Sequence, residues 1–457
     1  MKKDMVLKKE LGLFMATALV AGNMIGSGIL MLPASLASIS GPGSTILAWI
    51  FTGLGSIFLA LSFSRLGTKI PKTGGPYEYG KLAFGDFVGF MNAWLYWTAS
   101  WIGNAAIITS IASYTGNLFP IVKTSGTVAF LYTSAILWIF TILNIKGVRL
   151  AGIFQSFTTI FKLGLFIFFI GISAWHFDIA NIRPMFPMNA GIETLPAAAA
   201  ITLWAFSGFE TSTINAGEIK NPERNIKLST VFGISITVIL YLLISVTAMG
   251  AMPQDGLKLS AAPIIDIMAQ YLGTNITKII LFTAIVSVFG SAVGWLLTTA
   301  RMSYAAGKDK IFPEVFGRIH PKYNTPYMSL IINTVLTNIL LFMNYTGSLL
   351  SAFNFMVLLS ALAYLPVYAC TTLADILFLY REEWGLNKSE FIKGSLVPLI
   401  GLGYSIWAIC GSGTEVILYG CLLMLLGVPF YLYIKTKNKY KAGTNLKACE
   451  EIGEQVV

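Results

Sequence analysis

The chain has 457 residues, of which 55% are hydrophobic and 11% are charged, whereas soluble domains carry about 25% charged residues. This composition, with a mean hydropathy of +0.72, excludes a soluble globular protein and indicates an integral membrane protein with many spans. The formal net charge of +10 does not indicate nucleic-acid binding, because most lysines and arginines fall in alternate loops between apolar segments.

Twelve segments are apolar over about 20 residues, the length that crosses a bilayer as a helix. Because basic loops stay on the cytoplasmic side, the charge asymmetry predicts a multi-pass protein of the plasma (inner) membrane with both termini in the cytoplasm. The twelve segments start near Leu11, Ser44, Asp86, Thr127, Leu150, Leu195, Asn225, Thr274, Pro326, Ser351, Gly394 and Thr414.

The first segment is interrupted at residues 22–33, where three glycines and Pro33 fall at membrane depth. Backbone groups left unpaired in lipid cost several kcal/mol each, so such a break survives only where it lines a cavity inside the protein. We therefore interpret this stretch as half of a substrate site. The alternative is a glycine-rich face for close helix packing.

The third segment carries a polar stripe at a spacing of four residues, formed by Asn92, Tyr96, Ser100 and Asn104. This spacing places the four side chains on one face of a helix. Polar groups facing lipid are unfavourable, so the stripe is predicted to face a cavity or neighbouring helices. For Asn92, a simple hydrogen bond between helices is the alternative.

Lys162 lies near the middle of the fifth segment. A lysine at the centre of a membrane helix costs about 2.5 to 3.5 kcal/mol on insertion scales, which makes Lys162 a functional candidate. The sequence leaves two roles open. Lys162 is either a proton carrier or a fixed cation that substitutes for a bound ion and ties the fifth segment to the first.

The sixth segment contains a second break, with Ser207 and Gly208 in mid-span and Glu210 just beyond. Two broken helices, each the first in a set of five, are the signature of a transporter built from inverted repeats. The alternative, a glycine-rich face for helix packing, would have to apply to both breaks at matching positions. The stretch that follows, residues 217–225, is predicted to be a charged cytoplasmic turn.

The cysteines Cys370, Cys410, Cys421 and Cys449 lack the spacing of metal ligands, and the chain has no P-loop or dinucleotide-binding motif. We therefore expect no disulfide framework, no metal and no cofactor. Apart from the two buried charges of the fifth and sixth segments, no cluster of acids and bases is present, so an enzyme is not expected.

Five stretches together resemble the amino acid-polyamine-organocation superfamily, and most of all its basic amino acid and polyamine antiporters, which exchange arginine for agmatine, lysine for cadaverine or putrescine for ornithine. The resemblance implies a leucine-transporter-type fold with twelve transmembrane helices, arranged as five plus five inverted and two more. The stretches are residues 22–29, 95–97 together with 101–104, 202–210, 220–225 and 294–295.

The fold implied by this resemblance divides the chain into five parts. A cytoplasmic tail at 1–10 precedes the first repeat at 11–175, and the second repeat covers 195–379. The last two helices lie at 394–435, and a cytoplasmic tail follows at 436–457.

The resemblance also assigns roles to individual residues. Amides at 25–28 suit the substrate carboxylate at the positive end of a half-helix, and carbonyls around the second break suit the ammonium group. Trp204 is implied as the outer gate, Tyr96 and Glu210 as the inner gate, and Lys162 and Glu210 as coupling groups. The implied substrate-binding residues are Met24, Ile25, Gly26, Ser27, Gly28, Ser100, Asn104, Trp204, Ala205, Ser207, Trp295 and Leu359.

The chain departs from the arginine/agmatine exchangers in the tenth segment, where Leu359 and Ala363 stand in place of small hydroxyl residues and Val367 in place of a gate tyrosine. Lys162 also departs from the arginine/agmatine exchangers, and it resembles the lysine in the fifth segment of proton-coupled or neutral amino acid carriers. These departures weaken the assignment of the substrate and leave its identity open.

The function predicted from the sequence is alternating-access exchange of cationic amino acids or their amine products. A proton-coupled carrier of neutral amino acids is the alternative within the class, and a membrane amino acid sensor on a transporter fold is the alternative from another class. The expected partners are an amino acid substrate, the lipid bilayer, protons as a candidate coupling ion and a second copy of the chain as a candidate homodimer, with no nucleic acid.

Overall fold

The computed structural model describes the backbone of residues 7–26, 28–188, 190–260, 262–345, 349–381 and 388–454, with side chains left out at 274, 275, 277, 349–362, 388, 415, 416 and 439–454. These residues form helices and turns, with one isolated bridge between Leu11 and Ile219. The long helices are α3 (Pro42–Lys69), α5 (Asp86–Leu118), α7 (Gly126–Lys146), α8 (Val148–Trp175), α11 (Pro222–Ala251), α14 (Thr274–Lys308), α15 (Tyr327–Asn344), α16 (Leu349–Tyr380), α17 (Lys388–Gly411) and α18 (Thr414–Glu454).

Shorter helices occur at the two predicted breaks and in the connections. Among the α-helices they are α1 (Leu13–Met24), α2 (Leu32–Ile39), α4 (Pro76–Phe84), α6 (Ile121–Thr124), α9 (Leu195–Ala205), α10 (Thr211–Ile214), α12 (Gln254–Leu259) and α13 (Pro263–Leu272). The 3₁₀ helices are η1 (Gly28–Leu30), η2 (Ile179–Ile182), η3 (Ile192–Thr194), η4 (Ala216–Glu218) and η5 (Glu314–Gly317).

Within the described residues, nine helices are long and apolar enough to cross a membrane, namely α3, α7, α8, α11 and α14 to α18. The prediction of an all-helical protein with many spans is therefore confirmed. Three further predicted segments correspond to α1, to α9 and to α5. The total of twelve spans stays a prediction.

Prolines and glycines mark where the helices begin and end. Pro42, Pro76 and Pro222 stand in the first turns of α3, α4 and α11, where a missing N–H costs nothing and the fixed φ suits a helix. Gly85 and Gly147 separate neighbouring helices with φ of +93° and +152°, which residues with a side chain rarely adopt.

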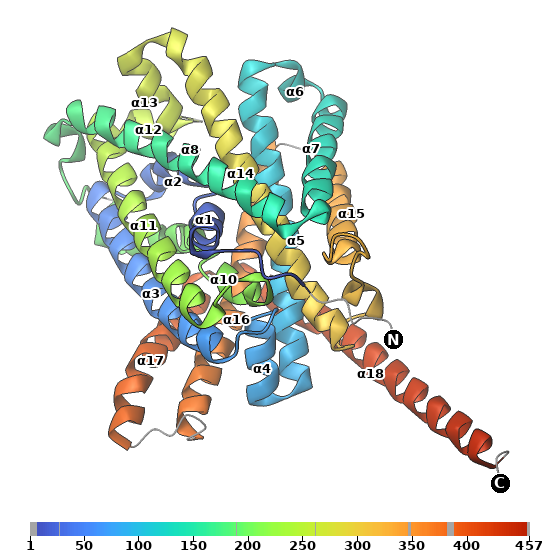
Figure 1. The fold of residues 1–457 in the computed structure, drawn as a ribbon. Coiled ribbons are helices and arrows are strands. Elements are labelled where there is room, and N and C mark those ends of the chain that lie inside the picture. The colour runs from blue at the N-terminus through green and yellow to red at the C-terminus, as the bar shows by residue number, and fades with distance from the viewer. Residues whose placement is uncertain are drawn as a thin grey trace.

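The short helix α1 lies near the centre of the bundle, enclosed by longer helices (Figure 1). It packs against α8, α10, α11 and α14, and its residues from Ala18 to Met24 are buried. The half of α1 next to the first break is therefore shielded from lipid, as the backbone beside an interruption must be.

Part of the charged turn after the second break is buried. The Glu218 side chain is buried against Arg301 of α14, with Arg301 Nε 2.7 Å from Glu218 Oε2 and the terminal nitrogen Nη2 2.9 Å from Oε1. The backbone carbonyl of Glu218 accepts the amides of Glu10 and Leu11, both at 2.9 Å. Glu218 thus lies in a buried junction between the N-terminal segment, η4 and α14.

Candidate functional site

The first break follows Met24, where α1 ends and the chain passes through η1 into α2. The amide of Ile25 donates to the carbonyl of Ala21 at 2.8 Å, and that of Gly26 donates to Met24 at 2.8 Å. Two of the amides expected to face a substrate carboxylate are thus bonded within the chain in this arrangement. Ser27, another predicted substrate residue, lies outside the described residues.

The second break follows Ala205, where α9 ends. The Ser207 amide and hydroxyl both donate to the carbonyl of Trp204, at 3.1 and 2.8 Å. The two breaks touch at Gly208, because a Cβ added there would lie 3.1 Å from the amide nitrogen of Met24 and 3.2 Å from the carbonyl carbon of Asn23. The interrupted segments therefore cross in direct backbone contact.

Gly208 gives a test of this crossing. Its φ is +112°, and the two atoms that an added Cβ would meet first belong to the backbone of the first break. We expect Gly208→Ala to lower the free energy of unfolding by about 1–3 kcal/mol, measured by thermal unfolding in detergent.

Gly164→Ala is the matched control, since a Cβ at Gly164 in α8 meets nothing within 4 Å and alanine favours a helix by about 0.5–1 kcal/mol. Equal stability of the two variants would contradict the close crossing of the breaks.

Tyr241 of α11 joins the two breaks through one hydroxyl. Its oxygen lies 2.6 Å from the carbonyl of Met24 and 3.2 Å from that of Ala205. These carbonyls belong to the set expected to receive the substrate ammonium group. The sequence reasoning did not identify Tyr241, because a single tyrosine in an apolar helix gives no periodic signal.

Asn23 joins the first break to α10 and α14. Its amide nitrogen donates to the hydroxyls of Thr211 and Thr298, at 3.1 and 3.3 Å, and its backbone carbonyl accepts the indole N–H of Trp295 at 3.0 Å. Trp295 is thereby fixed against the first break.

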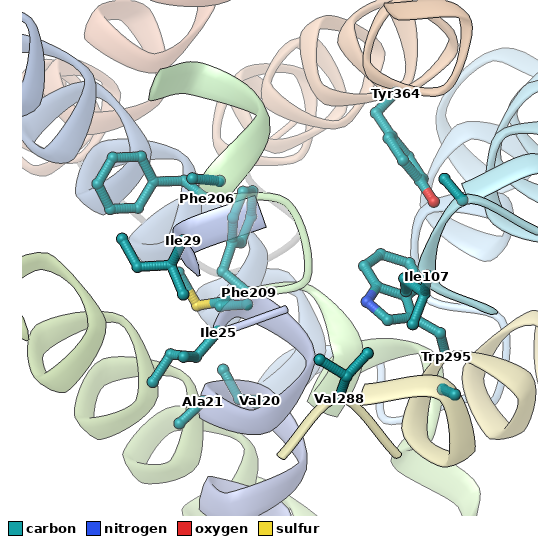
Figure 2. Close-up of a cluster of buried hydrophobic side chains, with 14 of the residues drawn as sticks. Val20, Ala21, Ile25, Ile29, Ile107, Phe206, Phe209, Val288, Trp295 and Tyr364 are labelled. Atoms are coloured by element: carbon teal, nitrogen blue, oxygen red, sulfur yellow. The ribbon is translucent and has the colours of Figure 1, made fainter. Parts of the chain in front are cut away.

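A small central cavity of about 20 Å³ lies between the breaks, room for about one water molecule. In Figure 2 the ring of Tyr364 extends from α16 toward Trp295, and the two ring centroids are 5.8 Å apart. Side chains must move apart before an amino acid fits, so the arrangement is closed. The lining residues are Asn23, Met24, Gly26, Gly28, Ile29, Gly103, Ile107, Trp204, Ala205, Ser207, Tyr241, Trp295 and Tyr364.

Seven of the predicted substrate residues line this cavity, and among the other described ones Ile25 and Ser100 contact neighbouring residues instead. The carbonyl of Ile25 is turned toward Lys162. Ser100 bonds to the Tyr364 hydroxyl at 3.0 Å. The side chain of Leu359 lies outside the described residues. The seven are Met24, Gly26, Gly28, Trp204, Ala205, Ser207 and Trp295.

Asn104 is buried one position along α5 from Gly103, which lines the cavity. Both polar atoms of its amide lack a hydrogen-bond partner among the described residues. An unpaired buried amide costs about 1–3 kcal/mol, so Asn104 has hydrogen-bonding capacity left for a ligand. Its substrate-binding role stays a prediction.

The predicted inner-gate residues are in contact. The Tyr96 hydroxyl donates to Glu210 Oε1 at 2.9 Å, and the Gly208 amide donates to Oε2 at 3.1 Å. Tyr96 and Glu210 are both fully buried. One bond thus joins α5 to the segment after the second break, where a moving helix would have to release it.

Lys162 is fully buried, and its ammonium group contacts three acceptors. Nζ donates to the carbonyl of Gly22 at 3.0 Å, to the carbonyl of Ile25 and to the Ser291 hydroxyl at 2.7 Å. The three donors of an ammonium group are thus matched by three oxygens. Lys162 ties α8 to the first break and to α14.

Two interrupted helices that face each other across a closed central cavity are the arrangement of secondary transporters, in which half-helix ends and freed backbone groups bind the substrate near the middle of the membrane. The fold and site thus define a membrane carrier. The chain belongs to the amino acid permease family, whose model matches residues 11–436.

Curated relatives of similar length support the family. An arginine/agmatine antiporter of Chlamydia pneumoniae is 31% identical over 451 residues, covering 94% of this chain and 91% of the relative. A putrescine transporter of Haemophilus influenzae is 30% identical over 433 residues, covering 94% of this chain and 98% of the relative. An arginine/agmatine antiporter of Chlamydia abortus is 30% identical over 443 residues, covering 93% and 90%.

Proposed function

We propose that this protein is an alternating-access exchanger of cationic amino acids or their amine products, with both termini in the cytoplasm. The observation that supports it most is the central cavity, where the Trp295 ring lies beside the crossing of the two breaks. The breaks supply backbone groups for the carboxylate and ammonium of an amino acid, and the indole face suits a cationic side chain.

The closed cavity supports a cycle in which an inner and an outer gate open in turn. On the inner side, release of the Tyr96–Glu210 hydrogen bond would let the segment after the second break move away from α5. On the other side, the Trp204 ring packs against Gly28, where an added Cβ would meet it at 2.4 Å. Trp204 therefore fits the role of the outer gate.

Exchange in proteoliposomes tests the proposal. Vesicles loaded with unlabelled arginine should take up labelled arginine, agmatine or putrescine, whereas empty vesicles should not. If only neutral amino acids inhibit uptake into the loaded vesicles, the assignment of a cationic substrate is wrong. Saturable ligand binding without any flux would favour a sensor instead.

A second candidate is a proton-coupled carrier of neutral amino acids. The observation that favours it is the buried Lys162 ammonium group, together with the absence of a carboxylate among the described residues that line the central cavity. A competition panel with and without an imposed pH gradient distinguishes the two candidates, since only the second requires the gradient for uptake.

Lys162→Gln tests whether this lysine carries the coupling proton. Because Nζ already has three acceptors, we expect a fixed cation. The variant should be less stable by about 2 kcal/mol, the value of a hydrogen bond to a charged group, and should exchange more slowly with an unchanged pH profile. The rates are measured in proteoliposomes across a pH series.

Lys123→Gln is the control, because Lys123 is an exposed lysine in α6, and it should behave as wild type. Loss of the pH dependence in Lys162→Gln alone would identify Lys162 as the proton carrier and favour the second candidate.

A further inference from the structure

A second cavity of about 390 Å³ lies between the turn that joins α3 to α4, the end of α14 and η4. It is far larger than the central cavity and has room for several water molecules or a small organic molecule. Its lining combines both signs of charge. The charged residues are Lys72, Glu78, Lys81, Lys308 and Asp309.

The charges in this cavity are not equally paired. Asp309 is satisfied, because Lys81 Nζ lies 2.5 Å from its Oδ2 and the Tyr77 hydroxyl donates to the same atom at 2.8 Å. Glu78 is buried, yet the nearest cation, Lys72 Nζ, stays 3.8 Å away on a side chain that is 62% exposed. No hydrogen bond is found for the Glu78 carboxylate among the residues that the structure describes.

The positive charge around the Glu78 carboxylate does not fully offset the cost of its burial. Burial raises the pKa of its carboxyl group above the ordinary value, and the negative charge of Asp309 raises it further, while Lys72, Lys81 and Lys308 act in the opposite direction. A cation that bound beside Glu78 would offset the cost of burying the carboxylate. Lys308, exposed at the end of α14, forms no ion pair within the described part of the chain.

The cavity adjoins the segment that follows the second break. The Gly74 amide in the α3–α4 turn donates to the carbonyl of Ile214 in α10 at 2.9 Å. Gly217 lines the cavity, directly before Glu218 of the buried ion pair. Tyr304, which also lines it, lies one helical turn beyond Arg301 on α14. A short stretch of chain, α10 and the start of η4, therefore connects Glu210 of the inner gate to the wall of the cavity.

We propose that this cavity is a second substrate site at the cytoplasmic mouth of the carrier, in which an amino acid places an ammonium group on Glu78 and its carboxylate on Lys308. The inference rests on the proposed exchange function, since it concerns the same substrates. This site is separate from the central cavity. Substrate arriving from the cytoplasm would bind there before the inner gate opens.

Transport from each face of the membrane tests the site. Inside-out vesicles present the cytoplasmic face and right-side-out vesicles the opposite face, and KM is measured for labelled arginine and agmatine in both. Glu78→Gln should raise KM about tenfold for both compounds at the cytoplasmic face only, the effect of losing a charge-assisted contact. The maximal rate should stay within about twofold of wild type.

Lys308→Gln separates the two charges, because agmatine lacks the carboxylate of arginine. This variant should raise the cytoplasmic KM for arginine and leave that for agmatine unchanged. Glu223→Gln is the matched control, since Glu223 is an exposed carboxylate at the start of α11 outside the cavity.

The outcomes separate this inference from the proposed function. Normal exchange with the same cytoplasmic KM in wild type, Glu78→Gln and Lys308→Gln would overturn the second site and leave the exchange function standing. An equal rise of KM at both faces would also overturn it, because it would indicate a general structural effect. Absence of exchange in the wild-type protein would overturn both.

Discussion

Trp295→Leu is expected to reduce exchange in proteoliposomes about a hundredfold while the protein stays folded. Trp295 is 6% exposed, lines the central cavity and donates its indole N–H to the carbonyl of Asn23 at 3.0 Å. Leucine keeps an apolar side chain but supplies neither a π face nor a donor.

The expected magnitude follows from the two interactions that are lost. A desolvated cation–π contact is worth about 2 kcal/mol, and a neutral hydrogen bond about 1 kcal/mol. A total near 3 kcal/mol corresponds to a loss of roughly a hundredfold. The loss should be larger for arginine than for a neutral competitor, because only a cation uses the π face.

Trp175→Leu is the matched control, since Trp175 at the end of α8 is 87% exposed and lies outside the cavity. Trp204→Ala is a second test of the site, because it removes the ring that covers Gly28. If both Trp295→Leu and Trp204→Ala show unchanged saturable exchange, the assignment of the central cavity as the substrate site is wrong. Size-exclusion profiles establish that the variants are folded.

The sequence was sufficient to locate the helices and the two breaks. The predicted starts at Asp86, Leu195, Thr274 and Thr414 are the first residues of α5, α9, α14 and α18, because runs of apolar residues bounded by turn formers leave few alternatives for a membrane segment. The breaks were visible for a related reason. Glycine, proline and charged residues at membrane depth stand out against an apolar background.

The contacts that close the site were not predictable in the same way. Tyr241 and Tyr364 lie in largely apolar helices, and whether their hydroxyls face lipid or a cavity depends on how the helices rotate and pack. Asn23 was part of a recognised motif, but its partners Thr211 and Thr298 come from distant helices. Sequence patterns report local periodicity and carry little information about such long-range pairs.

The burial of one charged pair was not predictable either. Glu218 lies in the predicted charged turn and Arg301 in α14, and charged residues are usually exposed. In the structure both are buried and paired. A charge is stable in a protein interior only when it is paired, and the pairing partner lies too far along the sequence to be recognised from local composition.

Glu218→Gln is expected to destabilise the protein by about 3–5 kcal/mol, because it leaves the Arg301 guanidinium buried without its carboxylate partner. The Arg301 side chain is fully buried and makes two hydrogen bonds to Glu218. Thermal unfolding in detergent, followed by tryptophan fluorescence, measures the change. Asp255→Asn is the control, since Asp255 pairs with Lys258 on the surface with a side chain that is 92% exposed, and it should change stability little.

A double variant identifies the source of the loss. Replacing both partners, as Glu218→Met with Arg301→Leu, removes the uncompensated charge, and such replacements are often neutral or stabilising by about 1–4 kcal/mol. We therefore expect the double variant to recover most of the stability that Glu218→Gln loses. If it is as unstable as Glu218→Gln, the cost lies in the backbone junction with Glu10 and Leu11 and not in the buried charge. If instead the double variant is stable but exchanges slowly, the Glu218–Arg301 pair contributes more to the transport cycle than to folding.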